Sequence, residues 1–344
     1  MGKNTNALLS VTDLKKYFPM RKKHLFQRER LFLRANDGIT LDILQGETFG
    51  LVGESGSGKS TFGRNILQLQ KPTEGKVLYY GTGEGVELTA LKSAQLRPLR
   101  KDLQIIFQDP YSSLDPRMTV GQIIEEGIAT HRFFRRGSVE MRNYVLRIMG
   151  DCGLREDMLH RYPHQFSGGQ RQRISIARAL AVKPKFIVCD ECVSALDVSI
   201  QAQILNLLSD LKEKEGLTYL FISHDLSVVR YLSDRIGVMY LGKIVEQGKA
   251  DEVFDNPCHP YTLALISAIP TVEEKQGEQI LLHGGMPSPI APPAGCPFHT
   301  RCFMAQEICK RIPAPLVEVK SGHMAACHFA KIPLREKQVR AMKK

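Results

Sequence analysis

The sequence of 344 residues contains no stretch of 18 or more apolar residues. A membrane-spanning helix needs about 20 such residues in a row, so we expect that the chain does not cross a membrane by itself. Its first ten residues, MGKNTNALLS, lack the apolar core of a signal peptide, which predicts a cytosolic protein. The composition, 43% hydrophobic and 24% charged, excludes disorder, collagen and small disulfide scaffolds.

Positive charge exceeds negative charge, with 47 Lys and Arg against 36 Asp and Glu. The excess is concentrated in residues 15–30 and 296–344, so the rest of the chain is nearly neutral. We interpret these segments as a solvated basic loop and a solvated basic tail. Attraction to anionic lipid headgroups is an alternative. No nucleic-acid partner is expected, because the excess charge belongs to these two segments and not to the body of the chain.

Residues 53–61, GESGSGKST, fit the phosphate-binding pattern G-x-x-x-x-G-K-[ST] between an apolar run and a helical pattern. The glycines let successive backbone N–H groups turn toward phosphate oxygens, and the helix start adds a positive dipole. Lys59 is expected to reach the β- and γ-phosphates, and the Ser60 hydroxyl to bind Mg²⁺. The predicted nucleotide-binding residues of this loop are Gly53, Ser55, Gly56, Ser57, Gly58, Lys59, Ser60 and Thr61.

Two apolar runs end in residues that suit phosphate hydrolysis. The run FIVCDE ends in Asp190, which we expect to hold Mg²⁺ directly or through water, and in Glu191, which is placed to polarise the attacking water. The run YLFISH ends in His224, whose imidazole can contact the γ-phosphate or that water. Glu191, His224 and Lys59, with Gln108, form the predicted catalytic set.

Short apolar runs that alternate with helical patterns predict an α/β fold with a parallel sheet. We expect strands at residues 8–18, 39–44, 48–52, 184–191, 217–225 and 236–248, and a helix at 59–69. The stretch from about 92 to 182 is mainly helical in pattern. A proline-rich segment at 286–297 predicts a boundary before a cysteine-bearing appendix.

The segment RYPHQFSGGQRQRISIARAL contains Ser167, Gly168, Gly169 and Gln170, and resembles the signature of ABC-type ATPases. A serine hydroxyl and two glycine N–H groups at a helix start form a second anion cradle. The resemblance implies a body with a RecA-like parallel sheet, an antiparallel β subdomain and a helical subdomain at about 92–182. It also implies a head-to-tail dimer in which each signature closes over the ATP held by the other subunit. A GTPase is disfavoured, because no N-K-x-D-like guanine motif is present.

This resemblance, which spans residues 8 to about 255, implies further roles. Gln108 matches the glutamine that senses the nucleotide, contacts the transmembrane partner and joins the Mg²⁺ site. Asp197 matches the acid at the dimer interface. Phe18 lies where the family stacks an aromatic ring on adenine, with Tyr17 as the second candidate, and a packed core residue is the alternative for Phe18. Cys192 replaces a common proline after the catalytic glutamate, but no reacting group is lost.

Three segments, at residues 108–120, 161–180 and 256–270, narrow the resemblance to the ATP-binding subunits of oligopeptide/dipeptide ABC importers of the peptide/nickel type. This implies an ATP-binding domain over 1–258 and a C-terminal extension over 259–344. It implies ATP hydrolysis that drives uptake of peptides through two separate permeases at the cytoplasmic face of the membrane. A second, similar ATPase is the favoured dimer partner, and a solute-binding protein outside the membrane acts indirectly. Import of nickel and an ABC ATPase that acts on nucleic acid or ribosomes are the alternatives.

Four of the eight cysteines cluster near the C-terminus. Four thiolates within 32 residues can surround one soft metal centre, whereas disulfides conflict with a cytosolic location. Zinc, for which His299, His323 and His328 are also near in sequence, and free thiols are alternatives, although the tight C-x₂₋₄-C pairs of zinc sites are absent. The cluster is similar to the cysteine motif of peptide-importer ATPases, which implies a structural [4Fe–4S] cluster on Cys296, Cys302, Cys309 and Cys327. The scattered Cys152, Cys189, Cys192 and Cys258 receive no ligand role.

Overall fold

The computed structural model describes residues 6–20, 30–269, 279–330 and 334. The chain divides into two compact units, and neither is continuous in sequence. The first unit comprises Met1–Leu8, Ile43–Thr48 and Tyr79–Ile222, and the second comprises Leu9–Asp42, Phe49–Leu78 and Ser223–Lys344. The phosphate-binding loop and the C-terminal extension therefore belong to the same compact unit. The domain boundary at residue 258 stays a prediction.

The first unit contains a parallel sheet. Its strands are β6 (Leu103–Ile106), β7 (Phe186–Asp190) and β8 (Thr218–Ile222), in the order β8-β7-β6. Every residue of β7 and β8 is buried, as expected for apolar runs that are covered on both faces. The two strands expected at 184–191 and 217–225 are confirmed. Strand β6 lies within the stretch expected to be helical, because four residues are too few to display a period.

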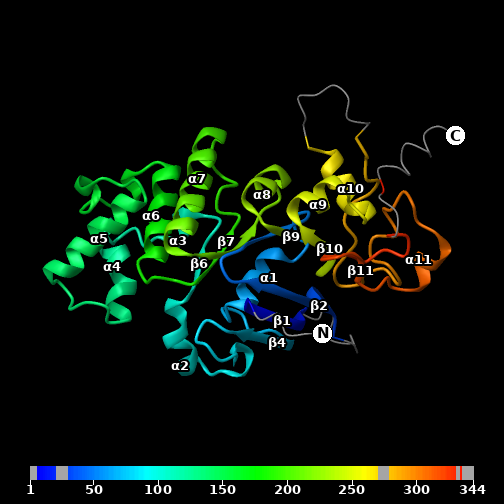
Figure 1. Cartoon of the computed structure of the whole chain (residues 1–344), viewed down its shortest axis with the longest axis horizontal. Helices are drawn as coiled ribbons and strands as arrows, with labels where there is room; N and C mark the ends of the chain where they lie inside the picture. The colour runs from blue at the N-terminus through cyan, green and yellow to red at the C-terminus, as the bar shows by residue number, and fades with distance from the viewer. Residues whose placement is uncertain (1–5, 21–29, 270–278, 331–333, 335–344) are drawn as a thin grey trace. The chain divides into compact units, whose positions relative to one another are not determined.

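Helices make up most of the remainder of the first unit. Helix α6 packs against α3, α4, α5 and α7 (Figure 1). Side chains before three of these helices cap their first N–H groups: Thr119 before α4, Ser138 before α5 and Ser167 before α6. The helices are α2 (Ser93–Leu96), α3 (Pro110–Ser113), α4 (Val120–Thr130), α5 (Val139–Asp151), α6 (Gly168–Leu180) and α7 (Val198–Glu215), and a short strand β5 (Val86–Glu87) precedes them.

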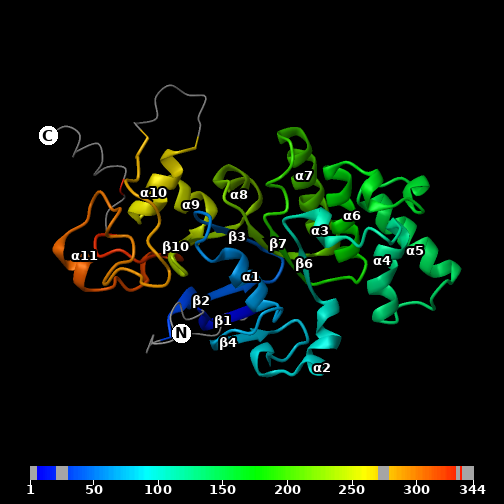
Figure 2. The same cartoon turned by 180° about the vertical axis from the view of Figure 1, so that it is seen from behind.

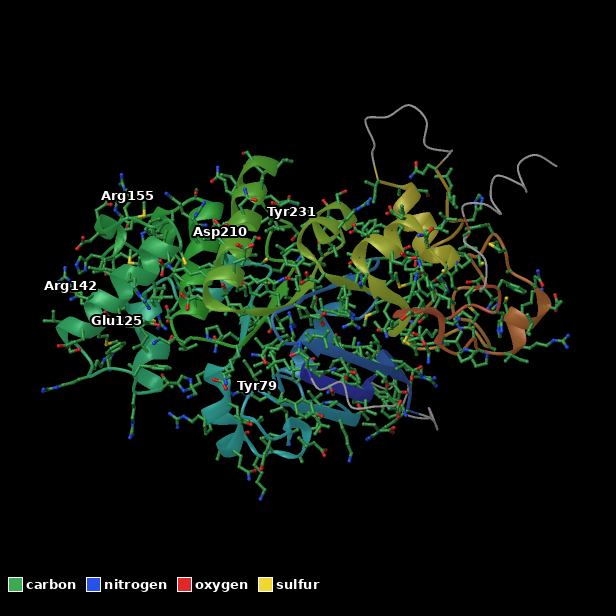
Figure 3. The ribbon with its side chains drawn as sticks, viewed as in Figure 1. Tyr79, Glu125, Arg142, Arg155, Asp210 and Tyr231 are labelled. Atoms are coloured by element: carbon green, nitrogen blue, oxygen red, sulfur yellow. The ribbon has the colours of Figure 1, made fainter. Side chains whose placement is uncertain are left out.

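The first unit has exposed charged side chains on its surface and a buried side-chain hydrogen bond in its interior. Arg142 on α5 and Arg155 are exposed and point away from the ribbon (Figure 3). Tyr79 is fully buried, and its hydroxyl donates to Asp102 Oδ2 at 3.0 Å. A satisfied buried hydroxyl costs little and fixes the packing of the segments that it joins.

A separate sheet in the second unit contains three long strands side by side. The order is β2 (Phe32–Leu44), β1 (Ala7–Pro19) and β4 (Glu74–Tyr79) (Figure 2). Strand β1 confirms the strand expected at 8–18 and contains the first residues of the basic segment 15–30. The Lys15 ammonium pairs with Glu74 at 2.8 Å, and Lys16 donates to the Lys71 carbonyl at 2.6 Å. Residues 21–29 of that segment lie outside the described residues.

The other sheet of the second unit joins the loop region to the extension. Strand β3 (Thr48–Val52) pairs in parallel with β9 (Arg235–Tyr240), and β9, β10 (Lys243–Lys249), β12 (His323–Ala325) and β11 (Val317–Lys320) are antiparallel neighbours. The extension, expected as an appendix, thus adds two strands to the edge of the ATPase sheet. The strand pair expected at 236–248 is confirmed.

The helices of the second unit are α1 (Lys59–Ile66), α8 (Leu226–Leu232), α9 (Ala250–Asp255), α10 (Pro260–Ser267) and α11 (Glu307–Arg311). Helix α1 ends three residues before the expected Leu69, because Gln68 adopts a left-handed φ of 53°. Over the described parts of the chain, no helix has the length and apolar character needed to cross a membrane.

Candidate functional site

The phosphate-binding loop depends on two glycines with positive φ. Gly53 has φ 151° and Gly58 has φ 106°. A Cβ atom at Gly53 would lie 2.2 Å from the Met239 carbonyl oxygen, and one at Gly58 would lie 2.1 Å from the Ala35 carbonyl oxygen. Both contacts are with backbone, which cannot move aside cheaply, so only glycine fits at these positions.

The loop is closed by its own lysine. The buried Lys59 ammonium donates to the carbonyl oxygens of Gly53 at 2.7 Å and Glu54 at 3.0 Å. The Ser57 N–H also donates to the Glu54 carbonyl, at 3.2 Å. These bonds direct loop carbonyls at the ammonium, and the helix start at Lys59 supplies the positive end of a dipole. The loop is therefore preorganised for an anion, with Ser60 and Thr61 following half-buried on α1.

Two buried asparagines hold the loop from behind. Asn36 on β2 donates to the Gly58 carbonyl at 3.1 Å, and Asn65 on α1 donates to the Asn36 side-chain oxygen at 2.9 Å. Both residues are fully buried. The sequence analysis missed them, because nothing in the local sequence distinguishes a buried asparagine from one in a turn.

The two candidate adenine-stacking residues occupy different environments on β1. Phe18 is half-buried, and the Lys16 ammonium lies 4.9 Å from its ring centroid. Tyr17 donates its hydroxyl to Asp37 at 2.5 Å, and the Arg34 guanidinium lies over its ring. Phe18 is thus neither fully buried nor fully exposed, and both stacking on adenine and packing in the core stay open for it. The Tyr17 ring is anchored through its hydroxyl, which favours Phe18 as the candidate for stacking.

The catalytic carboxylate candidates lie at the end of β7 in the first unit. Asp190 is 2% exposed. Glu191 has a left-handed φ of 48°, and its N–H donates to the Ile222 carbonyl at 3.0 Å. Its carboxylate accepts a 2.8 Å hydrogen bond from the amide of Gln108. The turn therefore aims the Glu191 side chain at Gln108, a strained conformation of the kind that gathers at functional sites.

The signature residues form the start of α6, also in the first unit. The Ser167 hydroxyl accepts from the Gln170 N–H at 3.4 Å, and the Gln170 side chain accepts from the Ser167 N–H at 3.1 Å. This reciprocal cap leaves the helix start well defined for an anion. A Cβ at Gly169 would lie 2.4 Å from the Ile200 Cγ2 atom, so the glycine also permits α6 to approach α7 closely.

Within the first unit, the structure brings Gln108 and Glu191 into contact. Within the second unit, residues 53–61 form the expected loop. Asp197 is exposed at the position before α7, in the first unit. His224 is exposed in the second unit, two residues before α8. The assigned roles of these residues stay predictions.

The four clustered cysteines converge on one pocket of the second unit. Their side chains line it together with His259, Phe298, His299, Met304 and His328. Among the described residues, no three of these four sulfurs lie within 4.8 Å of one another. His323, one of the histidines considered for zinc, does not line the pocket.

The pocket disfavours free thiolates. Burial raises the pKa of the Cys302 thiol to about 12, and it also raises the pKa values of Cys296 and Cys327. The neighbouring thiols raise the pKa values of these three groups further, because thiolates repel one another. Backbone N–H groups nevertheless point at sulfur, from Met304 to Cys302 and from Phe329 to Cys327, each at 3.4 Å. A bound cation would reverse the pKa shifts.

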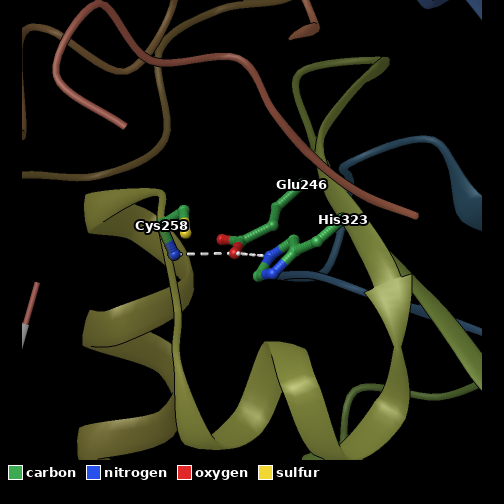
Figure 4. Close-up of side chains that lie close together, drawn as sticks. All are labelled: Glu246, Cys258 and His323. Carbon is green, nitrogen blue, oxygen red and sulfur yellow. Dashed lines mark hydrogen bonds and ion pairs between the residues drawn. The ribbon is translucent and has the colours of Figure 1, made fainter. Parts of the chain in front are cut away.

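A buried carboxylate ties this pocket to the sheet. Glu246 on β10 accepts hydrogen bonds from the N–H groups of Cys258 at 2.7 Å and His259 at 2.9 Å. Its Oε1 atom also lies 2.7 Å from His323 Nε2 (Figure 4). Burial lowers the pKa of His259 to about 3, and its Nδ1 atom accepts from the Tyr261 N–H, so this imidazole is neutral. The sequence analysis missed Glu246, which reads as one polar residue in a strand.

The sequence matches the ABC transporter family over residues 36–194 and the C-terminal region of the oligopeptide/dipeptide transporter family over residues 245–309. It is 50% identical to the oligopeptide transport ATP-binding protein AppF of Bacillus subtilis, over 95% of this chain and 98% of that protein. It is 49% identical to OppF of Salmonella typhimurium, over 93% and 96% of the two chains.

Solved structures agree in fold. The cbiO1 protein of Clostridium perfringens, part of the ABC transporter complex cbiONQ, aligns with a TM-score of 0.61 and 27% identity, over 73% of this chain and 91% of that chain. MJ0796, a bacterial ABC transporter cassette solved as a dimer, aligns with a TM-score of 0.59 and 31% identity, over 70% and 98%. The chain therefore belongs to the ABC transporter family, as an ATP-binding protein of the oligopeptide/dipeptide transporter branch.

Proposed function

We propose that this chain is the ATP-hydrolysing subunit of an importer for oligopeptides or dipeptides. The observation that carries the proposal is that one chain combines an intact phosphate-binding loop with the oligopeptide/dipeptide transporter C-terminal region. Its relatives are named for oligopeptide transport, over nearly their whole lengths. No observation on the described residues favours nucleic acid or ribosomes as the partner.

In this proposal the loop binds ATP. The Lys59 ammonium and backbone N–H groups of the loop other than that of Glu54 hold the phosphates, and Phe18 stacks on adenine. Ser60, Gln108 and Asp190 supply the oxygen ligands for Mg²⁺, a hard cation that prefers such donors. When bound, Mg²⁺ neutralises charge on the β- and γ-phosphates.

Glu191 is the proposed general base. Its carboxylate accepts a proton from the water that attacks the γ-phosphate, and His224 contacts that water or the phosphate. Gln108 holds the carboxylate at 2.8 Å in the structure, so this bond must exchange for water before hydrolysis. We propose that the exchange is how Gln108 senses the nucleotide.

The proposed assembly contains two ATPase subunits that pack head to tail. Ser167, Gly168, Gly169 and Gln170 close over the ATP bound by the partner subunit, and Asp197 lies at the interface. The dimeric form of MJ0796 supports such a pairing. A second, similar ATPase is the favoured partner, two permeases carry the peptide, and a solute-binding protein outside the membrane delivers it. The chain then lies at the cytoplasmic face of the membrane.

Transport is tested by coexpression of this chain with candidate permeases, a second ATPase and a binding protein, and by reconstitution of the complex in vesicles. We expect uptake of a labelled tripeptide that requires ATP on the side of this chain. Vesicles with Lys59→Ala serve as the control. Peptide-independent ATPase activity with no uptake of tripeptide, dipeptide or nickel would contradict the transport proposal, whereas nickel uptake alone would contradict only its peptide substrate.

We propose further that Cys296, Cys302, Cys309 and Cys327 hold a [4Fe–4S] cluster. The residues fit this group, because four thiols line one pocket and backbone N–H groups point at two of the sulfurs. A single zinc ion would hold its sulfurs about 3.8 Å apart at a zinc–sulfur distance of about 2.3 Å. The wider spacing of the sulfurs favours the larger cluster. When bound, the cluster supplies a cross-link within the extension.

Anaerobic purification tests the metal assignment. We expect a brown protein with broad absorption near about 400 nm and about four irons per chain. The Cys302→Ser variant should lose most of this absorption, while Cys152→Ser, which changes a cysteine remote in sequence from the cluster, should keep it. Stoichiometric zinc without iron would contradict the [4Fe–4S] assignment and support a zinc site.

A further inference from the structure

The phosphate-binding loop and the cysteine pocket are linked by Glu54, a loop residue to which we have given no direct role in phosphate binding. Arg301, which lies between Cys296 and Cys302 in the sequence, places its Nη1 atom 3.1 and 3.0 Å from the two Glu54 carboxylate oxygens. The Arg301 side chain is only 8% exposed. Both residues belong to the second unit.

Each polar group of Glu54 has a partner. Its N–H donates to the Tyr261 hydroxyl on α10 at 2.8 Å, and its carbonyl accepts from Lys59 at 3.0 Å. The side chain is held by Arg301, as described above. The extension therefore fixes the first turn of the loop through one side-chain contact and one backbone contact, while the loop lysine bonds the same residue.

The partners of Glu54 rest on the wall of the cysteine pocket. Phe298 lines that pocket, and its ring centroid lies 5.3 Å from that of Tyr261. The Arg301 N–H donates to the Phe298 carbonyl at 3.0 Å. Phe298 and Tyr261 are both fully buried. Close-packed interiors transmit displacements, so a change in the turn at 296–302 reaches Glu54 through these contacts.

Charge gives the contact a direct consequence for ATP. A carboxylate in a loop that binds a polyanion repels it, and the half-buried Glu54 side chain, which is 29% exposed, is only partly screened by solvent and salt. Arg301 balances the Glu54 charge and holds the carboxylate toward the extension. Without Arg301, the loop keeps an uncompensated negative charge beside its anion site.

We propose that Arg301 positions the phosphate-binding loop through Glu54, so that the cysteine-bearing turn of the extension tunes how tightly this chain binds ATP. This inference rests on the proposed function of the loop. Arg301 acts on the loop rather than on the nucleotide, so it is a positioning residue. A change at the four-cysteine site then changes the affinity of the phosphate-binding loop for ATP.

Titration of the full-length chain with a fluorescent ATP analogue tests the proposal. We expect Arg301→Ala to weaken binding about tenfold and to raise KM for ATP with little change in kcat. The double variant Arg301→Ala/Glu54→Gln should recover most of the affinity, because the unbalanced charge is gone. Arg301→Lys should recover part of it. The matched control is Lys320→Ala, which removes an exposed lysine of the same extension and should bind ATP normally.

A double-mutant cycle between Cys302→Ser and Arg301→Ala tests whether the cysteine site acts through Arg301. Cys302→Ser should weaken ATP binding in the chain that retains Arg301, and should weaken it by a smaller factor in the Arg301→Ala chain. Equal factors in both backgrounds, or an Arg301→Ala chain that binds ATP normally, would overturn the inference. A loss in Arg301→Ala that Glu54→Gln fails to restore would also overturn it. Failure of the unaltered chain to bind ATP would instead contradict the proposed function.

Discussion

The Glu191→Gln variant is expected to lose about 10²- to 10⁴-fold in kcat for ATP hydrolysis while it still binds ATP. The amide keeps the size and shape of the carboxylate, and its oxygen can still accept the hydrogen bond that Gln108 donates at 2.8 Å. What it loses is the ability to take a proton from water. Steady-state phosphate release and ATP-analogue titration measure the two effects separately.

In the proposed dimer, closure requires ATP binding and reopening requires hydrolysis, so we expect the variant dimer to stay closed on ATP. Size-exclusion chromatography with the partner ATPase and ATP detects this state. Glu213→Gln is the matched control, since it makes the same chemical change at an exposed position on α7, and it should hydrolyse ATP at the normal rate. Undiminished turnover in Glu191→Gln would exclude Glu191 as the base.

The Glu246→Ala variant is expected to destabilise the second unit by about 3–5 kcal/mol. The carboxylate is fully buried and accepts from two backbone N–H groups, and it lies 2.7 Å from His323. Its removal leaves these groups buried without an acceptor, which costs their full desolvation. The melting temperature should fall by roughly 10 °C.

Glu252→Ala provides the comparison for this variant. Glu252 also binds the extension, through Lys320 at 2.6 Å, but the lysine side chain is 66% exposed. Solvent screens such a pair, so its loss should leave the melting temperature nearly unchanged. Differential scanning calorimetry compares the two. A similar, small shift in both variants would show that Glu246 does not anchor the extension.

The strands that could be predicted are those that a continuous apolar run marks in the local sequence. The strands β3, β7 and β8 are continuous apolar runs between turn residues, and the sequence displays them directly. Strand β6 was missed because four residues between helical segments carry no period of their own. The extension was expected to stand apart, since nothing in its local pattern shows that β12 pairs with β10.

The sequence predicted where positive charge is concentrated but not which charged residues pair, because pairing depends on tertiary contacts. Lys15 and Arg301 were both assigned to solvated basic segments on composition alone. In the structure Lys15, within the strand that was expected at 8–18, pairs with Glu74, while Arg301 is nearly buried against Glu54. Net charge counts residues along the chain, whereas pairing depends on which residues the fold brings together.

The sequence by itself determined which consecutive residues form the predicted nucleotide site. The phosphate-binding loop, the acids after β7 and the signature before α6 each act within a few consecutive residues, so their order in the chain specifies them. Only the tertiary structure decided how the extension meets that site. Arg301 and Glu54 are 247 positions apart, and His323 and Glu246 are 77 apart. Contacts at such separations follow from the packing of whole elements, which no local periodicity encodes.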